Sequence, residues 1–485
     1  LRGLLKTENI PLLSIDELSQ REMEELEKYF DDQIFPILTP LAIDAYRPFP
    51  MLANKSLNLA IILEDTVDRG TAKEAIVQVP ALLDRFIKIG DDCRFVLLED
   101  VISHFIHKLF QGYVVKSITE FRITRNADLT IHEEGARDLL LEIEKELKKR
   151  KWGAAVRLEV EKNKYDPQVV DFLVNVLEIH KNDIYYIHGP LDLTFLFSFA
   201  DTIEEDHEHL TYPAQIPQQP QDILDDETVF EAALKRDVFL HHPYESFEPV
   251  IELLEDAALD PNVLAIKQTL YRVSGKSPII KSLKQAAENG KQVTVLVELK
   301  ARFDEEQNVQ WAKELEKAGC HVIYGMVYLK THSKITLIVR KRENKIERFV
   351  HLSTGNYNDT TAKIYTDMGI ITTNREFGID ATNFFNYLSG YTEKPKFYHF
   401  SMAPFDIRDD FIRYIDEEIN FHKKNGNGHI IAKMNALTDK LLIKKLFEAS
   451  RAGVKIDLII RGIRCLSPNI QGVSGKITAT RSVSR

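Results

Sequence analysis

The sequence predicts a multidomain protein in which an α+β part is followed by a duplicated α/β part. With 485 residues, the chain is longer than one hydrophobic core usually supports. From Asp226 onward, helix-like and strand-like segments alternate, as they do in sheets that helices cover. A pattern that begins at Ser277 returns at Lys440, at a constant offset of 163 residues. We therefore expect roughly two to four domains, including two related α/β copies.

The first part mixes helices and strands without regular alternation. A helix is expected within Leu12–Leu38, where Ser14 and Glu17 can form a capping box. Strands are expected at Leu57–Leu63, Ala75–Val79, Phe86–Ile89, Phe95–Leu98 and Val156–Val160, with an extended pair across Tyr113–Ile131. Further helices are expected at Ala136–Arg150 and Gln168–Ile179. Prolines among glutamines after Ala200 then indicate an irregular crossing between domains.

The second part predicts a largely parallel sheet with helical cover. Its expected helices are Phe247–Ala258, Pro278–Glu288 and Asp304–Ala318. Its expected strands are Val263–Leu270, Val293–Leu299 and His321–Gly325. A hairpin follows, in which Lys334–Arg340 and Glu347–Ser353 are joined by a polar turn at Lys341–Lys345.

The repeat extends over a helix and the strand that follows it. Ile280 matches Ile443, and Gly290 matches Gly453, each in the same register. The helices in front also correspond, Phe247–Ala258 with Ile407–Ile419. Generic similarity between αβ units is the alternative explanation, but a glycine and several core positions in one register favour duplication.

The open end of the hairpin brings together groups that suit phosphoryl chemistry. If the turn is centred on Arg342–Asn344, the numbers of facing residues add up to 687, so that His332 lies opposite Gly355 and beside Asn356. His332 and Lys334 are two residues apart and project to one face if the strand extends that far. The imidazole can attack phosphorus, while the ammonium and the Gly-Asn corner can hold oxygens. A surface histidine at a strand end is the simpler alternative.

Three arginines fall at or just after the ends of expected strands, where open α/β sheets bind ligands. These are Arg272, Arg302 and Arg461. Guanidinium is permanently charged and binds phosphate with two hydrogen bonds, so the three together predict a phosphate cage. Tyr365 could stack on a base, or it could be a packed core residue.

Several other polar residues leave their roles open. Asp367, Glu298 and Asp304 are candidates to orient the imidazole or to hold a cation. We expect a structural role for His351, and the pair His241-His242 indicates a loop.

Composition limits the classes of function. The net charge of −11, from 63 basic and 74 acidic residues, argues against a general nucleic-acid coat. Between Pro261 and Lys345 there are 16 Lys and Arg against 8 Asp and Glu, which fits a focused anion site or a solvated basic face. Three widely separated cysteines indicate a reducing compartment and no disulfide or metal spacing. We expect no signal peptide, and the sequence contains no apolar run of the length that a membrane span needs.

The chain resembles bacterial polyphosphate kinases of the phosphohistidine type, within the phospholipase D superfamily. The resemblance rests on LHHPYESF, AIKQTLYR, VELKARFDEEQN, LKTHSKITLI, STGNYN, AKIYTD and LIIRGIRCL, which together span most of Leu240–Leu466. It implies a middle domain at 1–218 and two phospholipase D-like domains, a first at 219–399 and an incomplete second at 400–485. The small N-terminal helical domain of the family is not expected within this sequence.

The resemblance also implies an activity and its residues. His332 would be the phosphorylated nucleophile, and Tyr365 and Arg461 would contact ATP. Arg272 and Arg302 match positions at the phosphates and Mg²⁺, and because arginine cannot coordinate a cation we expect them to act as phosphate clamps. The implied partners are ATP or ADP and inorganic polyphosphate, with a homo-oligomer expected and no specific nucleic acid. The implied location is cytoplasmic, with peripheral attachment to the inner face of the membrane as an alternative.

Two rival functions remain at this point. A phospholipase D-type phosphodiesterase or nuclease would use paired His-x-Lys motifs, but the aspartate of that superfamily, five residues after the lysine, is replaced by Val339. A non-catalytic scaffold would bind polyphosphate or nucleotide without a covalent intermediate. We interpret the sequence as a piece of a longer polypeptide, and we expect the acid/base histidine of the second copy within about ten residues after Arg485, by the repeat offset.

Overall fold

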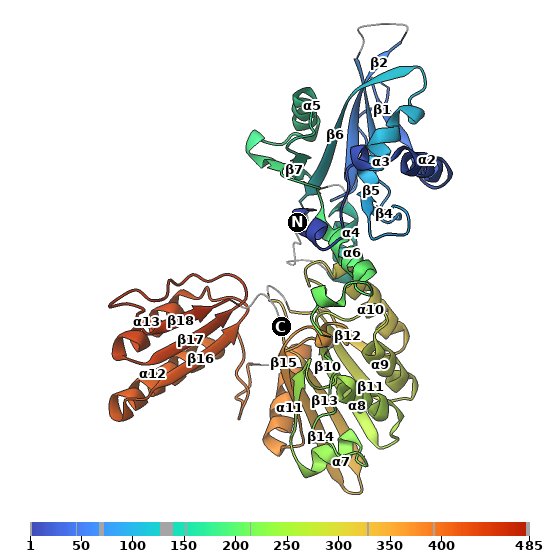
Figure 1. Cartoon of the computed structure of the whole chain (residues 1–485). Coiled ribbons are helices and arrows are strands. Elements are labelled where there is room, and N and C mark those ends of the chain that lie inside the picture. Colours follow the sequence, from blue (N-terminus) through green and yellow to red (C-terminus); the bar gives the residue numbers. More distant parts are fainter. Residues whose placement is uncertain are drawn as a thin grey trace. The chain divides into compact units, whose positions relative to one another are not determined.

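The computed structural model describes residues 2–44, 46–66, 72–126, 139–150, 153–213, 215–326, 329–390 and 393–481. The chain divides into two compact units, Leu1–Ala214 and Gln215–Arg485 (Figure 1). Within the described ranges, no helix combines the length and the hydrophobicity needed to cross a bilayer. The predicted combination of α+β and α/β parts is confirmed.

Unit 1 is built on a six-stranded sheet in the order β1-β3-β2-β6-β7-β8. Its strands are β1 (Pro40–Ile43), β2 (Leu57–Asp65), β3 (Ala72–Gln78), β6 (Tyr113–Arg125), β7 (Ala155–Glu161) and β8 (Ile184–Ile187). A separate hairpin is formed by β4 (Phe86–Lys88) and β5 (Phe95–Leu97). One face of the large sheet packs on α2 (Gln20–Tyr29) and α3 (Leu98–Phe105), and the other packs on α5 (Pro167–Leu177). The remaining helices are α1 (Arg2–Thr7), α4 (Leu139–Arg150) and α6 (Leu196–Ile203).

Two predictions for unit 1 need correction. The helix expected within Leu12–Leu38 is broken, because the Ser14 capping box starts only one turn and a second box at Ser19 starts α2. Past Tyr29 the chain continues in short π and 3-10 turns. The extended pair expected across Tyr113–Ile131 begins as one long strand, β6, and its last residues lie outside the described ranges, as does the start of the expected helix at Ala136.

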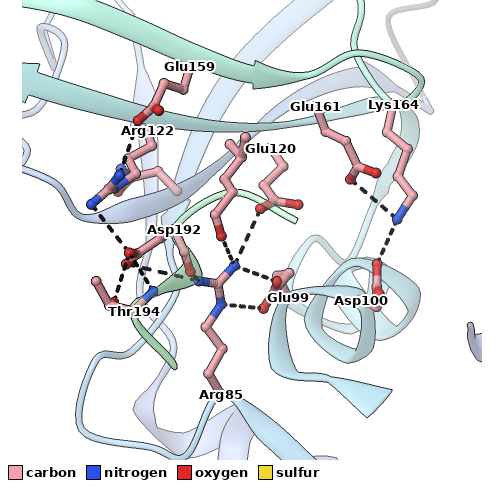
Figure 2. A network of polar contacts seen from close by, with 12 residues as sticks. Arg85, Glu99, Asp100, Glu120, Arg122, Glu159, Glu161, Lys164, Asp192 and Thr194 are labelled. Atoms are coloured by element: carbon pink, nitrogen blue, oxygen red, sulfur yellow. Dashed lines mark hydrogen bonds and ion pairs between the residues drawn. The ribbon is translucent and has the colours of Figure 1, made fainter. Parts of the chain in front are cut away.

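A buried ion network joins the strands of unit 1 to the loops beside them (Figure 2). The guanidinium of Arg85 donates to both carboxylate oxygens of Glu99, at 3.0 and 2.6 Å. It also lies 3.9 Å from Glu120, whose buried Oε1 has no hydrogen-bond partner among the described residues. Burial raises the pKa of Glu120 well above its ordinary value, and the charge of Glu99 raises it further.

Unit 2 contains a seven-stranded sheet in the order β12-β11-β10-β13-β14-β15-β9. Its strands are β9 (Val238–His242), β10 (Val263–Leu270), β11 (Gln292–Val297), β12 (His321–Ile323), β13 (Ile335–Arg342), β14 (Lys345–Ser353) and β15 (Asp367–Thr372). Only the β10–β11 and β11–β12 pairs are parallel. The expectation of a largely parallel sheet is therefore wrong. Strand β13 pairs antiparallel with β10, and β14 then pairs antiparallel with β13.

Helices cover both faces of this sheet. Helix α11 (Arg375–Ser389) packs against Leu337 and Val350 on one face. On the other face, Phe230 of α7 (Val229–Lys235) packs edge-on against Phe349 at 4.6 Å. The crossover helices are α8 (Glu248–Leu259), α9 (Pro278–Glu288) and α10 (Glu305–Lys317).

The hairpin forms in the predicted register. Ile335 faces Leu352 and Arg342 faces Lys345, so that the numbers of facing residues add up to 687. The pair His241-His242, expected as a loop, instead ends the edge strand β9, where His242 faces Asp367 on β15. The reason for this error is that edge pairing depends on a partner more than 120 residues away along the chain, which no local pattern reveals.

The second α/β copy has the same helix and strand as the first. Helix α13 (Lys440–Ala452) and strand β17 (Lys455–Ile460) correspond to α9 and β11, and both strands begin and end at the predicted offset of 163 residues. Strands β16 (His429–Met434) and β18 (Ile477–Thr480) flank β17 in a parallel sheet. The helix expected at Ile407–Ile419 extends to Asn425 as α12 (Ile407–Asn425).

Candidate active site

His332 lies in the loop that leads into β13, close to Tyr271 after β10 and to Glu298 after β11. Its ring meets the ring of Tyr271 edge-on, with centroids 4.7 Å apart. Lys334 Nζ lies 3.0 Å from His332 Nδ1 and donates to the His332 carbonyl oxygen at 2.6 Å. The predicted convergence of the imidazole and the ammonium therefore occurs, although regular pairing starts only at Ile335.

The local environment disfavours positive charge on both groups. His332 is exposed, yet partial desolvation is the main reason why its pKa lies below the ordinary value, with Lys334 and Arg272 lowering it further. Lys334 is only 5% exposed, and burial lowers its pKa to about 8 against the opposing effect of Asp367. The imidazole is thus held neutral at pH 7, which is the form that can attack phosphorus.

A buried carboxylate holds the histidine loop in place. Glu298, at the end of β11, accepts hydrogen bonds from the backbone N–H of Thr331 at 2.6 Å and of Lys300 at 3.0 Å. Asn308 donates to the carbonyl oxygens of Tyr271 at 2.8 Å and of Glu298 at 2.9 Å. Glu298 therefore orients the backbone beside His332, whereas the ring itself contacts Tyr271 and Lys334.

Two of the three arginines lie side by side. Arg272 follows β10, and its Nε lies 2.6 Å from Asp304 Oδ2. Its Nη2 donates to the carbonyl oxygen of Arg302 at 3.0 Å. Because Arg272 also lowers the pKa of His332, its charge acts on the same small volume as the imidazole.

The Gly-Asn corner is packed against β15. A Cβ atom on Gly355 would lie 2.6 Å from Asp367 Oδ2, so this close approach requires glycine. Asp367 also accepts a hydrogen bond from Thr354 Oγ1 at 2.8 Å. Asn356 Oδ1 is buried without a partner in the described part of the chain, so it has an unused hydrogen-bonding position.

Tyr365 and Arg461 form a second cluster. The Arg461 guanidinium lies 5.6 Å from the centroid of the exposed Tyr365 ring, and Asn435 Oδ1 accepts from Arg461 Nε at 3.0 Å and Nη2 at 2.8 Å. Among the described residues, no hydrogen bond, ion pair or ring contact joins this pair to His332. The predicted residues therefore form two clusters, one around the imidazole and one around an aromatic ring.

Comparison with known proteins gives the family. The chain matches models of the polyphosphate kinase middle domain at residues 21–199, C-terminal domain 1 at 228–394 and C-terminal domain 2 at 400–485. A polyphosphate kinase of Bacillus cereus is 65% identical over 99% of this chain and 69% of the relative. One of Halalkalibacterium halodurans is 64% identical with the same coverage. The chain belongs to the polyphosphate kinase family.

A solved structure supports this membership at the level of the fold. The crystal structure of polyphosphate kinase from Porphyromonas gingivalis matches 100% of this chain and 71% of that chain, with a TM-score of 0.83 and 28% sequence identity. The chain thus has the multidomain architecture of the polyphosphate kinase family along its whole length.

In this member of the polyphosphate kinase family, sequence reasoning missed Tyr271 and Asn308 as parts of the site. Tyr271 stands directly before Arg272, and its position at a strand end was a usable signal. Nothing in the local pattern around Asn308 indicates that its amide ties two strand ends together. Glu298 was considered as a partner of the imidazole, but its hydrogen bonds go to backbone N–H groups.

The described residues include no group of three or more His, Cys, Asp or Glu side chains that could hold a metal ion. The charged groups that lower the pKa of His332 are the cations Lys334 and Arg272. Such a site fits Mg²⁺ only as an ion that phosphate oxygens and water coordinate, which is how Mg²⁺ commonly binds in phosphoryl-transfer sites.

Proposed function

We propose that this chain transfers the γ-phosphoryl group of ATP to inorganic polyphosphate, reversibly, through a phosphohistidine on His332. The observation that carries the proposal is the neutral imidazole with Lys334 Nζ at 3.0 Å and Arg272 close enough to lower its pKa. Membership of the polyphosphate kinase family supports the choice of substrates.

The reaction has two balanced steps. The lone pair of an imidazole nitrogen attacks the γ-phosphorus, a P–N bond forms, and the bond to the bridging oxygen breaks so that ADP leaves. A terminal oxygen of polyphosphate then attacks the phosphohistidine, the P–N bond breaks, and the chain grows by one phosphate. In the reverse direction, polyphosphate phosphorylates His332, and the phosphohistidine then transfers its phosphoryl group to ADP to give ATP.

Lys334 has to change partners during the first step. A charged ammonium group only donates hydrogen bonds, so Lys334 Nζ, at 3.0 Å, donates to the Nδ1 lone pair of His332. Phosphate oxygens are stronger acceptors, and they draw Lys334 away from the ring as ATP binds. The imidazole is thereby released when a phosphate is present to attack.

The remaining predicted residues bind different parts of ATP and polyphosphate. Arg272 and Arg302 clamp phosphate oxygens beside His332, and Asn356 holds a further oxygen at the corner. Tyr365 stacks on the adenine while Arg461 reaches the phosphates from the second copy, an assignment supported by their mutual contact. Positioned charge is the main source of rate in phosphoryl transfer, where one arginine can contribute roughly 10³–10⁵.

Mg²⁺ enters this proposal with the nucleotide. When bound, it would neutralise charge on the phosphates that Arg272 and Arg302 clamp. We further propose domain boundaries at 1–218, 219–399 and 400–485, and assembly as a homo-oligomer. The separate cysteines support a cytoplasmic location, and peripheral membrane attachment remains the alternative location.

Labelling the full-length protein with γ-³²P-ATP tests the nucleophile. We expect a protein adduct that is labile in acid and stable in alkali, and that chases into long polyphosphate when the polymer is added. His332→Ala should abolish the label, while His321→Ala, at an exposed position on β12, should retain it. Equal labelling of both variants would refute the assignment, and cleavage of phosphodiesters without nucleotide would favour the hydrolase instead.

A further inference from the structure

A row of buried polar side chains lies beneath the Gly-Asn corner, on the sheet face opposite α11. Thr336, His351, Tyr357 and His242 are each at most 2% exposed. None of them belongs to the proposed chemistry, and polar groups buried this deeply are costly unless they are paired. Their hydrogen bonds therefore indicate what the row does.

The first half of the row has a defined direction. Thr336 Oγ1 donates to the hydroxyl oxygen of Tyr357 at 2.8 Å. The hydroxyl hydrogen of Tyr357 is then free to bind His351 Nδ1, which lies 2.9 Å away. A neutral imidazole that accepts at Nδ1 carries its proton at Nε2, so His351 presents an N–H donor at the far side of its ring.

The second half of the row has the complementary polarity. His242 Nδ1 lies 3.0 Å from the carbonyl oxygen of Glu245. A carbonyl oxygen can only accept, so Nδ1 carries the proton and Nε2 of His242 is a lone-pair acceptor. The Nε2 atoms of both histidines are buried and have no other partner in the described part of the chain.

Gly369 opens the space between the two rings. In the register of β14, β15 and β9, His351, Gly369 and His242 lie on one face, with Gly369 diagonally between the histidines. A Cβ atom on Gly369 would lie only 3.1 Å from His351 Nε2. A positive charge on His242 would also lower the pKa of His351, so the two rings are close enough to interact electrostatically.

We propose that one water molecule joins the two rings across Gly369, accepting from His351 Nε2–H and donating to His242 Nε2. The result is a one-directional chain that runs from Thr336 through Tyr357, His351 and His242 to the Glu245 carbonyl. His242 is its terminal positioning residue.

The hydrogen-bonded chain passes next to the proposed phosphate site at Tyr357. Tyr357 directly follows Asn356, so anchoring the Tyr357 hydroxyl fixes the backbone of the Gly355–Asn356 corner. The side chain of Asp367, the register partner of His242, packs closely against Gly355. The corner is thus fixed at two points, and a displacement of about 1 Å at such a site can cost roughly 10²-fold in rate. This inference rests on the proposed role of His332 and Asn356.

Two variants of His242 separate positioning from packing. In His242→Leu the acceptor is lost, whereas in His242→Gln a carbonyl oxygen can take the place of Nε2. At saturating ATP we expect His242→Leu to form the His332 adduct at least roughly tenfold more slowly, with an unchanged half-saturating ATP concentration. His242→Gln should recover to within about threefold of wild type. His241→Leu, at the neighbouring position on β9, is the matched control.

Each outcome decides the proposal. It is overturned if His242→Leu labels as fast as wild type, or if His242→Gln is as slow as His242→Leu. If His242→Leu does not fold, ¹⁵N-histidine NMR of the wild-type full-length protein provides the test. We expect His351 as the Nε2–H tautomer and His242 as the Nδ1–H tautomer, with assignments from single substitutions; the reverse tautomer at His351 overturns the chain. Failure of wild type to label at all would instead refute the proposed function.

Discussion

Lys334 is the residue whose environment most directly predicts a pH dependence. Burial lowers its pKa to about 8, while the neighbouring His332 is kept neutral to a pH below its ordinary 6.5. The proposed step needs a neutral imidazole and a charged ammonium. These requirements overlap only between the two pKa values, so the pH range of activity is set by two adjacent side chains.

We therefore expect the rate of His332 labelling to follow a bell-shaped pH profile. It should rise as pH increases through the lowered pKa of His332 and fall as pH increases through about 8, where Lys334 loses its proton. Lys334→Arg keeps the charge at all accessible pH values, so its alkaline limb should disappear even if its rate is lower. Single-turnover labelling between pH 5 and 9.5 measures this; an unchanged alkaline limb in the variant would show that another group titrates there.

Glu298 gives a second prediction at the residue scale. Its carboxylate accepts from two backbone N–H groups, so Glu298→Gln sets an amide donor against one of them. We expect labelling to slow by about tenfold because Thr331 and His332 lose their fixed backbone, with little change in ATP binding. Glu316→Gln, on the same unit in α10, is a control that should label normally. A normal rate in Glu298→Gln would mean that the loop holds its shape without this carboxylate.

At the scale of elements, the site depends on close contact between the corner after β14 and the start of β15. Gly355→Ala would place a methyl group 2.6 Å from Asp367 Oδ2, and either the corner or β15 must move. We expect at least about tenfold slower labelling and weaker phosphate binding. Gly275→Ala serves as the matched control, because its Cβ would meet no atom within 4 Å. Normal activity in Gly355→Ala would show that the corner does not hold phosphate.

The elements also show how far sequence patterns reach. Strand Val263–Leu270 and helix Pro278–Glu288 were predicted with their observed bounds, because β-branched runs, Pro at a first turn and a following Gly are local signals. The hairpin register followed from the position of its turn. Strand β9 and the antiparallel pairing of β13 with β10 were not predicted, since both depend on pairing between distant segments. The roles of Tyr271 and Asn308 were missed for the same reason.

At the scale of the whole molecule, unit 1 contributes stability through the buried network of Figure 2. Glu99 and Glu120 share one guanidinium, but only Glu99 is bidentate on Arg85. The raised pKa of Glu120 means that the folded state retains this proton to a higher pH than the unfolded chain does. The contribution of protonated Glu120 to stability is therefore complete below about pH 4.5, and it is lost as pH rises through the folded-state pKa.

The same Glu→Gln change at the two positions should thus have opposite effects on the melting temperature. Glu120→Gln removes a carboxylate that is costly to ionise, and we expect its melting temperature at pH 8 to exceed that of wild type by roughly 2–4 °C. The gain should vanish towards pH 4.5, where Glu120 is neutral anyway. Burial also raises the pKa of Glu99, but Glu99→Gln leaves the buried Arg85 guanidinium without its bidentate partner, so we expect a lower melting temperature at pH 8. Thermal unfolding followed by circular dichroism at both pH values checks the pair, and a loss of stability in Glu120→Gln at pH 8 would contradict the argument.

The pairing of β9 with β15 has a consequence for synthesis on the ribosome. Every strand of the seven-stranded sheet lies between Val238 and Thr372. The edge strand β9 is synthesised before the loop that carries His332. At about 5–20 residues per second, translation of residues 373–485 takes roughly 6–23 s. During that interval all strands around His332 have been synthesised, whereas the second α/β copy, which carries Arg461, is still incomplete.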